Sequence, residues 1–292
     1  MVQTRTIQLI IFCLLIISMQ VLVQLGASTN SGDYVVLESL KEEWENVPPS
    51  WDGSDPCNDP WEGIDCNNSR VISIKLSSIN LKGELSGDIE GLSELQILLV
   101  LEASGNIRAK KKALAPAGSI IQQRLDRFPQ SIESLKSLPI LILVGCGFSG
   151  LIPNTIGSLS QLEFLSLNLN NFIGTIPASV GNLSKLRWLD LADNKLSGPL
   201  PISHGSTPGL DMLVHTKHFH LGRNQFSGEI PDQLFSSNMT LKHLLLEQNQ
   251  LTGKIPPSLG LVQTLEVVRL DRNSLDGSIP STLKNLTLTS EL

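Results

Sequence analysis

The sequence has few aromatic residues (4%) and few charged residues (17%), and its net charge at pH 7 is −6. The scarcity of clustered lysine and arginine argues against nucleic acid as a partner, because phosphate binding needs such clusters. With 41% hydrophobic residues the chain is too apolar for a disordered protein. Its 23 glycines and 16 prolines are too many for a helical bundle. The composition therefore indicates a folded protein that is rich in turns.

Outside its N-terminus the chain lacks an apolar run of the ~18 residues that a membrane span needs. The exception extends from Ile7 to Leu25, follows Arg5 and is followed by the small residues Gly26-Ala-Ser28. A positive residue, an apolar stretch and small residues in this order are typical of a secretory signal peptide. We therefore assign residues 1–28 to a signal peptide, with a retained membrane anchor as the alternative. The expected location is secreted or extracellular.

Cysteines are scarce, and Cys13 would leave with the signal peptide. Cys57, Cys66 and Cys146 remain, an odd number for an oxidising compartment. Four N-glycosylation sequons are also consistent with a secretory route, and their acceptors are Asn67, Asn182, Asn238 and Asn285.

The sequence repeats itself from residue 71 onward. The runs 162–177, 186–201, 241–256 and 265–280 share the pattern L-x-x-L-x-L-x-x-N-x-L-x-G-x-I-P. The first position of its L-x-L core recurs mostly at intervals of 24 residues, at Ile74, Leu98, Leu141, Leu165, Leu189, Phe219, Leu244 and Val268. A fixed period of this length predicts a solenoid of stacked coils.

Each part of the repeat has a physical role. The L-x-L alternation directs both apolar residues inward from a short strand and the x residues outward. A buried asparagine can satisfy open backbone groups of the turn, which cost ~1–3 kcal/mol each when they lack partners. The glycine permits a positive φ, and the Ile-Pro pair favours extended chain. We predict a ladder of one such side chain per coil, namely Cys146, Asn170, Asn194, Asn224, Asn249 and Asn273.

The L-x-G-x-I-P ending resembles the plant-specific class of leucine-rich repeats (LRRs), over residues 71–283. The preceding segment, with Trp51, Asp55-Pro-Cys57 and Trp61-Glu-Gly-Ile-Asp-Cys66, resembles the N-terminal cap of plant LRR receptor kinases. That resemblance implies a disulfide between Cys57 and Cys66. A zinc site is the less favoured alternative, because no histidine lies nearby in the sequence.

A narrower resemblance comes from three short segments. Thr207–Leu213 together with Lys217-His-Phe-His220 is similar to a lengthened repeat in subfamily VIII of these receptor kinases, and Leu143–Gly150 also fits that group.

Gly145, Gly147 and Gly150 match G-x-G-x-x-G, but they stand where other repeats have their turn, so dinucleotide binding is not expected. Cys146 is expected to be a buried thiol, with a redox sensor or an interchain disulfide as alternatives.

The expected fold is an α/β-type solenoid, a right-handed curved LRR array with short parallel β-strands on its concave face. Its convex side should be irregular or 3-10 helical, and a helical cap should precede it. We assign the cap to 29–70 and about eight LRRs to 71–292, with a long repeat near 202–218. An insertion near 102–127 interrupts the second repeat. We expect a solvated loop there, with a basic partner-binding loop as the alternative.

The outward strand positions are where such a scaffold presents a binding surface. An exposed apolar patch has no structural need there, so it marks an interaction surface, with glycan cover or drift as the alternative. Three histidines lie beside it, and we expect them to form a solvated polar surface without a metal, with a metal site or a pH sensor as alternatives. The candidate ligand-binding residues are Ile140, Ile142, Val144, Phe164, Trp188, Asp190, His218, His220 and His243.

The favoured function is a recognition module without catalytic residues or cofactor, resembling the ectodomain of a plant receptor-like kinase in cell-surface signalling. Its ligand would be a peptide, a small molecule or a protein, possibly joined by a co-receptor. Kinase motifs are absent from the sequence. The alternatives are the N-terminal part of a truncated transmembrane receptor serine/threonine kinase and a secreted LRR inhibitor of a cell-wall enzyme.

Overall fold

The computed structural model describes residues 28–79, 81, 85–101 and 128–291. Most of the expected signal peptide and the whole insertion at 102–127 lie outside the described residues. Among the described residues, no helix reaches the length and apolarity that crossing a membrane requires.

The array begins with helix α2 (Ser31–Glu43), which starts where the Asn30 side chain accepts the backbone N–H of Gly32. Its buried face includes Leu37 and Leu40, and it provides the helical cap that the sequence analysis expected. Strand β1 (Ile64–Asn67) then pairs antiparallel with β2 (Arg70–Ser77). These elements cover the apolar end of the first coil, which has no preceding coil to pack against.

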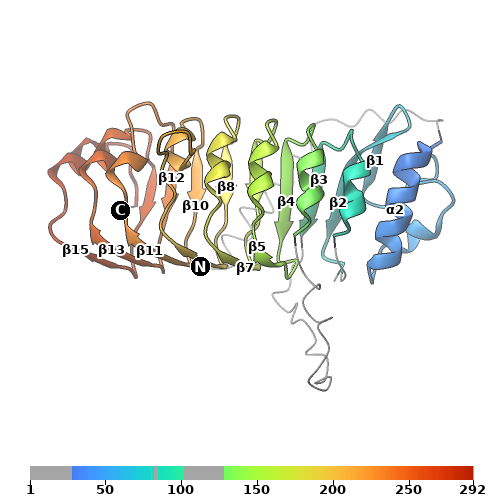
Figure 1. Cartoon of the computed structure of the whole chain (residues 1–292), viewed down its shortest axis with the longest axis horizontal. Coiled ribbons are helices and arrows are strands. Elements are labelled where there is room, and N and C mark those ends of the chain that lie inside the picture. Colours follow the sequence, from blue (N-terminus) through green and yellow to red (C-terminus); the bar gives the residue numbers. More distant parts are fainter. Residues whose placement is uncertain (1–27, 80, 82–84, 102–127, 292) are drawn as a thin grey trace, which may run out of the picture.

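A nine-stranded sheet runs along one side of the described chain, in the order β1-β2-β3-β4-β6-β8-β10-β12-β14 (Figure 1). From β2 onward each strand is parallel to the next, and equivalent repeat positions are in register, as in Leu165 opposite Leu189. We call this the inner sheet. Its remaining strands are β3 (Ile97–Leu101), β4 (Ile140–Val144), β6 (Phe164–Ser166), β8 (Trp188–Asp190), β10 (His218–His220), β12 (His243–Leu245) and β14 (Val267–Arg269).

A second parallel sheet, which sequence analysis did not anticipate, follows the turn of each coil. Its strands are β5 (Ser149–Leu151), β7 (Asn171–Gly174), β9 (Lys195–Gly198), β11 (Gln225–Glu229), β13 (Gln250–Lys254) and β15 (Ser274–Asp276). The repeat pattern predicted a glycine turn here and extended chain only at the Ile-Pro pair that follows. The pairing arises because stacking brings equivalent extended segments of successive coils within hydrogen-bonding distance.

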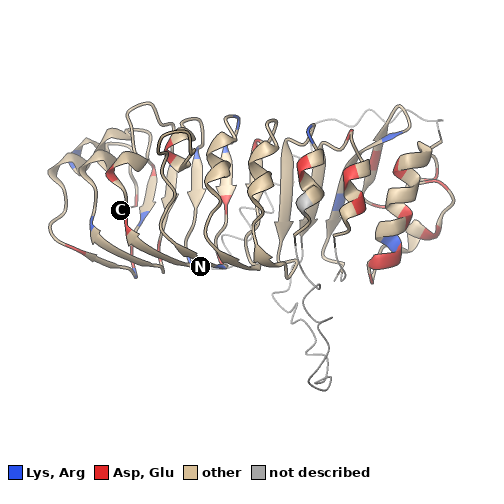
Figure 2. Ribbon diagram, viewed as in Figure 1, with Lys and Arg blue, Asp and Glu red and all other residues tan. Residues whose placement is uncertain are grey.

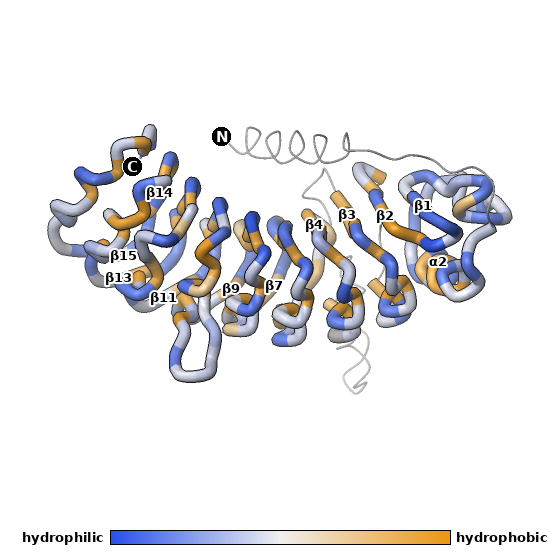
Figure 3. Tube along the Cα trace, turned by 90° about the horizontal axis from the view of Figure 1, so that it is seen from above, coloured by the Kyte–Doolittle hydropathy of each residue, from blue (hydrophilic) through white to orange (hydrophobic). Residues whose placement is uncertain are grey.

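Short 3-10 helices occupy the opposite side of each coil. Figure 3 shows the array bending so that the strands of the inner sheet lie on the concave side. The LRR-type solenoid with parallel strands inside and 3-10 helices outside is therefore confirmed. The 3-10 helices after the cap are Gly87–Gly91, Gln130–Ser134, Asn154–Ser158, Ala178–Asn182, Leu210–Met212, Asp232–Leu234, Pro257–Leu261 and Ser281–Asn285.

One continuous apolar core fills the coils. The inward residues Leu165, Leu189 and Phe219 are almost completely buried. Their neighbours in successive coils pack against them in columns, so truncating one such leucine should cost ~2–5 kcal/mol.

The asparagine ladder closes the turn after each inner strand. Asn194 donates to the carbonyl oxygens of Leu167 (2.9 Å) and Leu191 (3.2 Å), on the preceding coil and on its own. Its Oδ1 accepts the Phe172 N–H at 3.0 Å. The same pattern of donors and acceptors recurs at Asn170, Asn224, Asn249 and Asn273.

Each of these turns also contains a residue in the left-handed region just before the asparagine. Asp193 has a φ of 55°, and the equivalent residues are Leu169, Arg223, Gln248 and Arg272. A side chain in this region costs ~1–2 kcal/mol, and the repeat pattern did not predict it. The glycine later in the repeat does adopt a positive φ, 77° at Gly174.

Candidate functional site

The inner sheet places equivalent outward residues of adjacent strands directly opposite one another. Phe164, Trp188, His218 and His243 are successive partners on β6, β8, β10 and β12. Because neighbouring strands lie ~4.8 Å apart, such a row is a continuous track across the concave surface. Acidic residues gather instead on α2 and on the 3-10 helices that follow it (Figure 2).

The expected apolar patch divides into two parts in the structure. Ile140, Ile142 and Val144 are 8%, 2% and 5% exposed, so the expectation of an outward exposed patch was wrong for these three residues. They form an apolar cluster separate from the core, because branched side chains on adjacent strands pack against one another's flanks. Phe164 and Trp188 border this cluster and are half-buried.

Leu99 belongs to the same apolar cluster and was not among the candidate residues. It lies opposite Ile142 in the register of β3 and β4. Its outward position in the second repeat was the signal that could have identified it.

The three histidines converge next to Trp188. The ring centroids of Trp188 and His218 are 4.2 Å apart, and those of His218 and His243 are 4.5 Å apart. His220 and His243 are stacked with centroids 5.8 Å apart. All three imidazoles are half-buried, so they are less solvated than the sequence analysis expected. Large neighbouring rings remove water from each imidazole.

Burial controls the ionisation of two of these rings. Loss of hydration, together with the nearby His243 and His220, lowers the pKa of His218 to about 3. Burial and His220 likewise lower the pKa of His243. Both imidazoles are therefore neutral at neutral pH, and at His218 this holds into strongly acidic solution.

The polar atoms around these rings are incompletely paired. His218 Nδ1 and His220 Nε2 are buried without a hydrogen-bond partner. The other nitrogen of His220, Nδ1, faces Asp190 Oδ2 at 3.7 Å. Asp190 is itself buried, and its Oδ1 accepts the Ala192 N–H at 3.1 Å. Asp190 therefore lies close to His220 and offers no exposed charge to a ligand.

Comparison with known proteins identifies the repeats of this chain. The family model for the Leucine Rich Repeat matches residues 161–183, 185–206, 240–261 and 264–286. A probable leucine-rich repeat receptor-like protein kinase of Arabidopsis thaliana is 51% identical over 263 residues, which are 89% of this chain and 26% of that protein. The chain thus spans about a quarter of that relative's length.

Solved structures point the same way. The LRR ectodomain of the Arabidopsis membrane receptor kinase GASSHO1/SCHENGEN3 is 28% identical, with a TM-score of 0.72 over 89% of this chain and 29% of that one. The Arabidopsis receptor kinase HAESA is 25% identical, with a TM-score of 0.50 over 90% of this chain and 48% of that one. This chain contains leucine-rich repeats and is similar to the ectodomains of plant receptor-like kinases. Because its relatives are ectodomains of receptor kinases, the similarity implies an extracellular or cell-surface location for this chain.

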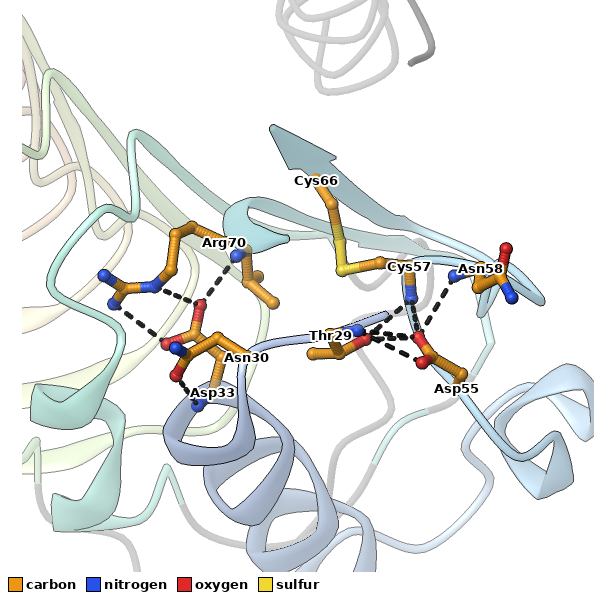
Figure 4. The surroundings of a disulfide bond; sticks show 9 residues. Thr29, Asn30, Asp33, Asp55, Cys57, Asn58, Cys66 and Arg70 are labelled. Atoms are coloured by element: carbon orange, nitrogen blue, oxygen red, sulfur yellow. Dashed lines mark hydrogen bonds and ion pairs between the residues drawn. A yellow bond between two sulfur atoms is a disulfide. The ribbon is translucent and has the colours of Figure 1, made fainter. Parts of the chain in front are cut away.

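The cap of this LRR module contains the disulfide that the family resemblance implied. Cys57 and Cys66 are bonded, with their Cα atoms 5.6 Å apart (Figure 4). Beside the bond, Asp55 accepts hydrogen bonds from Thr29 and from the backbone N–H groups of Cys57 and Asn58. Burial raises the pKa of Asp55, but these hydrogen bonds outweigh it and hold the pKa below 3.8.

Cys146 takes the ladder position of its coil. Its thiol lies 3.6 Å from the Val100 carbonyl oxygen on the preceding coil and 3.5 Å from that of Val144. The asparagine amides make equivalent contacts in their own coils. Gly145 and Gly147, with φ of 71° and 75°, flank it within the turn. The G-x-G-x-x-G match is therefore part of an LRR turn and does not begin a helix that could bind a dinucleotide.

The four sequon asparagines are exposed. Asn182 and Asn285 end 3-10 helices on the convex side of the LRR module. Asn67 ends β1, and Asn238 lies in the loop between Leu234 and β12. None of the four belongs to the parallel strands of the inner sheet, so glycans at these positions would leave its central face open.

Proposed function

We propose that this LRR module is an extracellular recognition domain that binds an extended peptide across its inner sheet. The observation that carries the proposal is the row Phe164, Trp188, His218 and His243, in which each coil contributes one large, half-buried ring. Half-buried aromatic residues offer a ligand contact area at little cost in side-chain entropy.

The burial of residues on the inner sheet limits which of them a ligand could contact. Ile142 and its neighbours in the apolar cluster are too deeply buried to touch a ligand directly, so they serve as a rigid base. Phe164 and Trp188 would then anchor an apolar side chain of the peptide, and the histidines would contact its polar groups. Such an arrangement suits a peptide whose apolar and polar residues are separated along its length.

The solved relatives favour a peptide over the other ligand classes. HAESA was crystallised with the peptide hormone IDA and the co-receptor SERK1, and GASSHO1/SCHENGEN3 with CASPARIAN STRIP INTEGRITY FACTOR 2. A co-receptor that contacts both peptide and LRR surface is therefore part of the proposal.

The test begins with peptides from plant extracellular fluid that are captured on the purified protein and identified by mass spectrometry. Synthetic copies are then titrated by calorimetry against wild type, Trp188→Ala and Met212→Ala. Met212 is a matched control, because it is an exposed apolar side chain on the convex side. We expect Trp188→Ala to weaken binding at least about tenfold, as loss of an interface anchor does, and Met212→Ala to leave it unchanged. Equal binding by all three proteins would refute the proposed surface.

We further propose that the protein is secreted, that residues 1–28 direct it there and that its sequons carry glycans. Expressed in plant cells, it should accumulate in the extracellular fluid and lose mass after enzymatic removal of N-glycans. A version without residues 1–28 should stay inside the cell without glycans. Full-length protein that remains inside the cell without glycans would contradict this route.

A further inference from the structure

Three imidazoles meet at one point on the concave surface of the module. One nitrogen from each of His218, His220 and His243 lies within 4.8 Å of the others. His218 and His243 are opposite each other in the register of β10 and β12. His220 lies two residues beyond His218 and therefore projects from the same face of the sheet.

The spacing of these nitrogens is close to that of a tetrahedral metal site. Zn²⁺ binds histidine nitrogen at ~2.0–2.1 Å, which places the nitrogens of a tetrahedral site roughly 3.3 Å apart. Nitrogens that lie within 4.8 Å of one another need to approach by at most about 1.5 Å to reach that separation, and rotation of the imidazole side chains can supply such a movement. The two strands are fixed by their pairing and by the core residues Phe219 and Leu244 beneath them, so the three histidines are held in place before any ion binds.

The position of Asp190 favours the tautomer of His220 that a metal ligand requires. Asp190 Oδ2 faces Nδ1 of His220, so the proton is favoured on Nδ1 and the lone pair on Nε2. That Nε2 is buried and has no hydrogen-bond partner. A carboxylate behind a histidine that binds metal through its other nitrogen is a common arrangement in zinc proteins.

His218 adds a second observation of the same kind. Its Nδ1 is also buried without a hydrogen-bond partner. A buried polar atom without a partner costs ~1–3 kcal/mol. Two such atoms within one cluster of three histidines indicate that the cluster binds a ligand that these residues share. Since one nitrogen of each of the three rings lies within 4.8 Å of the others, a single ion between the rings is a ligand that all three can share.

We propose that His218, His220 and His243 bind one Zn²⁺ ion, with the fourth coordination position open toward the concave surface. Three neutral nitrogens suit a borderline ion such as Zn²⁺, whereas Mg²⁺ and Ca²⁺ prefer oxygen ligands. Asp190 provides the nearby negative charge that favours a cation here. The open position would take water or one donor group of a ligand. This site does not depend on the peptide proposal, since the ion alone is its ligand.

The experiment is a calorimetric titration of the purified, chelator-treated protein with ZnCl₂. Wild type should bind one Zn²⁺ per chain at the cluster, and Co²⁺ in its place should give the intense visible absorption of a tetrahedral site. Binding should also raise the melting temperature as the free Zn²⁺ concentration increases. Binding of Zn²⁺ only with the weak, multiple-site behaviour of surface groups, and no tetrahedral Co²⁺ spectrum, would overturn the proposal.

Variants separate the cluster from other zinc-binding groups. His220→Gln and His243→Gln should each lose at least about 10- to 100-fold in Zn²⁺ affinity, since removing a ligand costs no less than removing its orienting partner. Asp190→Asn, which keeps an acceptor for Ala192, should weaken binding less. His204→Gln and His215→Gln are matched controls, because these two histidines are exposed and lie outside the cluster.

The outcomes are distinct. Loss of binding in the cluster variants with retention in the controls supports the site, provided that circular dichroism shows folded protein. Equal loss in the controls, or unchanged binding in His220→Gln and His243→Gln, refutes it. If the peptide experiment fails while zinc binds as expected, the metal site stands and the proposed peptide surface falls.

Discussion

The asparagine ladder and the histidine cluster are two sets of buried polar groups in neighbouring parts of the same coils. In the ladder, the amide of Asn194 donates to carbonyls of two coils and accepts an N–H from the preceding one. In the cluster, His218 and His220 each have a buried nitrogen without a hydrogen-bond partner. The difference teaches that the polar groups of the ladder are satisfied within the scaffold, whereas these two histidine nitrogens have no hydrogen-bond partner in it.

The largest effect should come from breaking the ladder. Asn194→Leu leaves buried backbone groups of two coils without partners, so we expect a loss of about 3 kcal/mol in the free energy of unfolding. Denaturant unfolding followed by circular dichroism measures it. Asn154→Leu is the matched control, because Asn154 is exposed at the start of a 3-10 helix, and its effect should stay within about 0.5 kcal/mol. Similar losses in both variants would disprove the structural role of the ladder.

Removal of the cap disulfide should have the next largest effect. Cys57→Ser combined with Cys66→Ser releases a short loop, and the loop-entropy model gives a loss of about 2–3 kcal/mol. Because coils contact only their neighbours, the loss of hydrogen-exchange protection should be concentrated in α2, β1 and β2. Uniform loss of protection as far as β14 would show that the cap and the distant coils unfold as one unit.

Asp55→Asn should produce a smaller, pH-dependent effect on stability. The folded pKa of Asp55 lies below 3.8, so its carboxylate stabilises the fold above that pH, and the contribution is lost as the pH falls through the folded value. The variant should melt at a lower temperature than wild type at pH 7, and the gap should close in strongly acidic solution. Melting curves at several pH values test this. A gap that stays constant with pH would show that charge is not involved.

The smallest effect on stability should come from a substitution in the histidine cluster. His218→Phe keeps a ring against Trp188 and removes the unpaired Nδ1, so the protein should lose no stability and should gain up to about 1 kcal/mol in the free energy of unfolding. The same denaturant experiment measures it. A loss as large as that of Asn194→Leu would mean that the two sets of polar groups are equivalent, and the comparison would fail.

Much of the scaffold was predictable because the residues of each repeat determine its local conformation. The L-x-L alternation identified Leu165 and Leu189 as inward residues, and the glycine of the repeat marked a turn that needs a positive φ. The left-handed conformation of Leu169 was not predictable, since its side chain gives no sign of it and the closure of the coil imposes it. The second sheet was not predicted either, because each of its strands forms hydrogen bonds only with strands of adjacent coils, which are distant in the sequence.

The sequence by itself determined the period, the inward leucines, the asparagine positions and the outward columns of the inner sheet, because these depend on short-range geometry that recurs in every coil. Only the tertiary structure decided which outward side chains are buried and which atoms converge. Ile142 is covered by neighbours from other strands, and the nitrogens of His220 and His243 meet although 22 residues lie between them in the chain. Burial and ligand geometry depend on how far one coil turns relative to the next, and no single repeat contains that information.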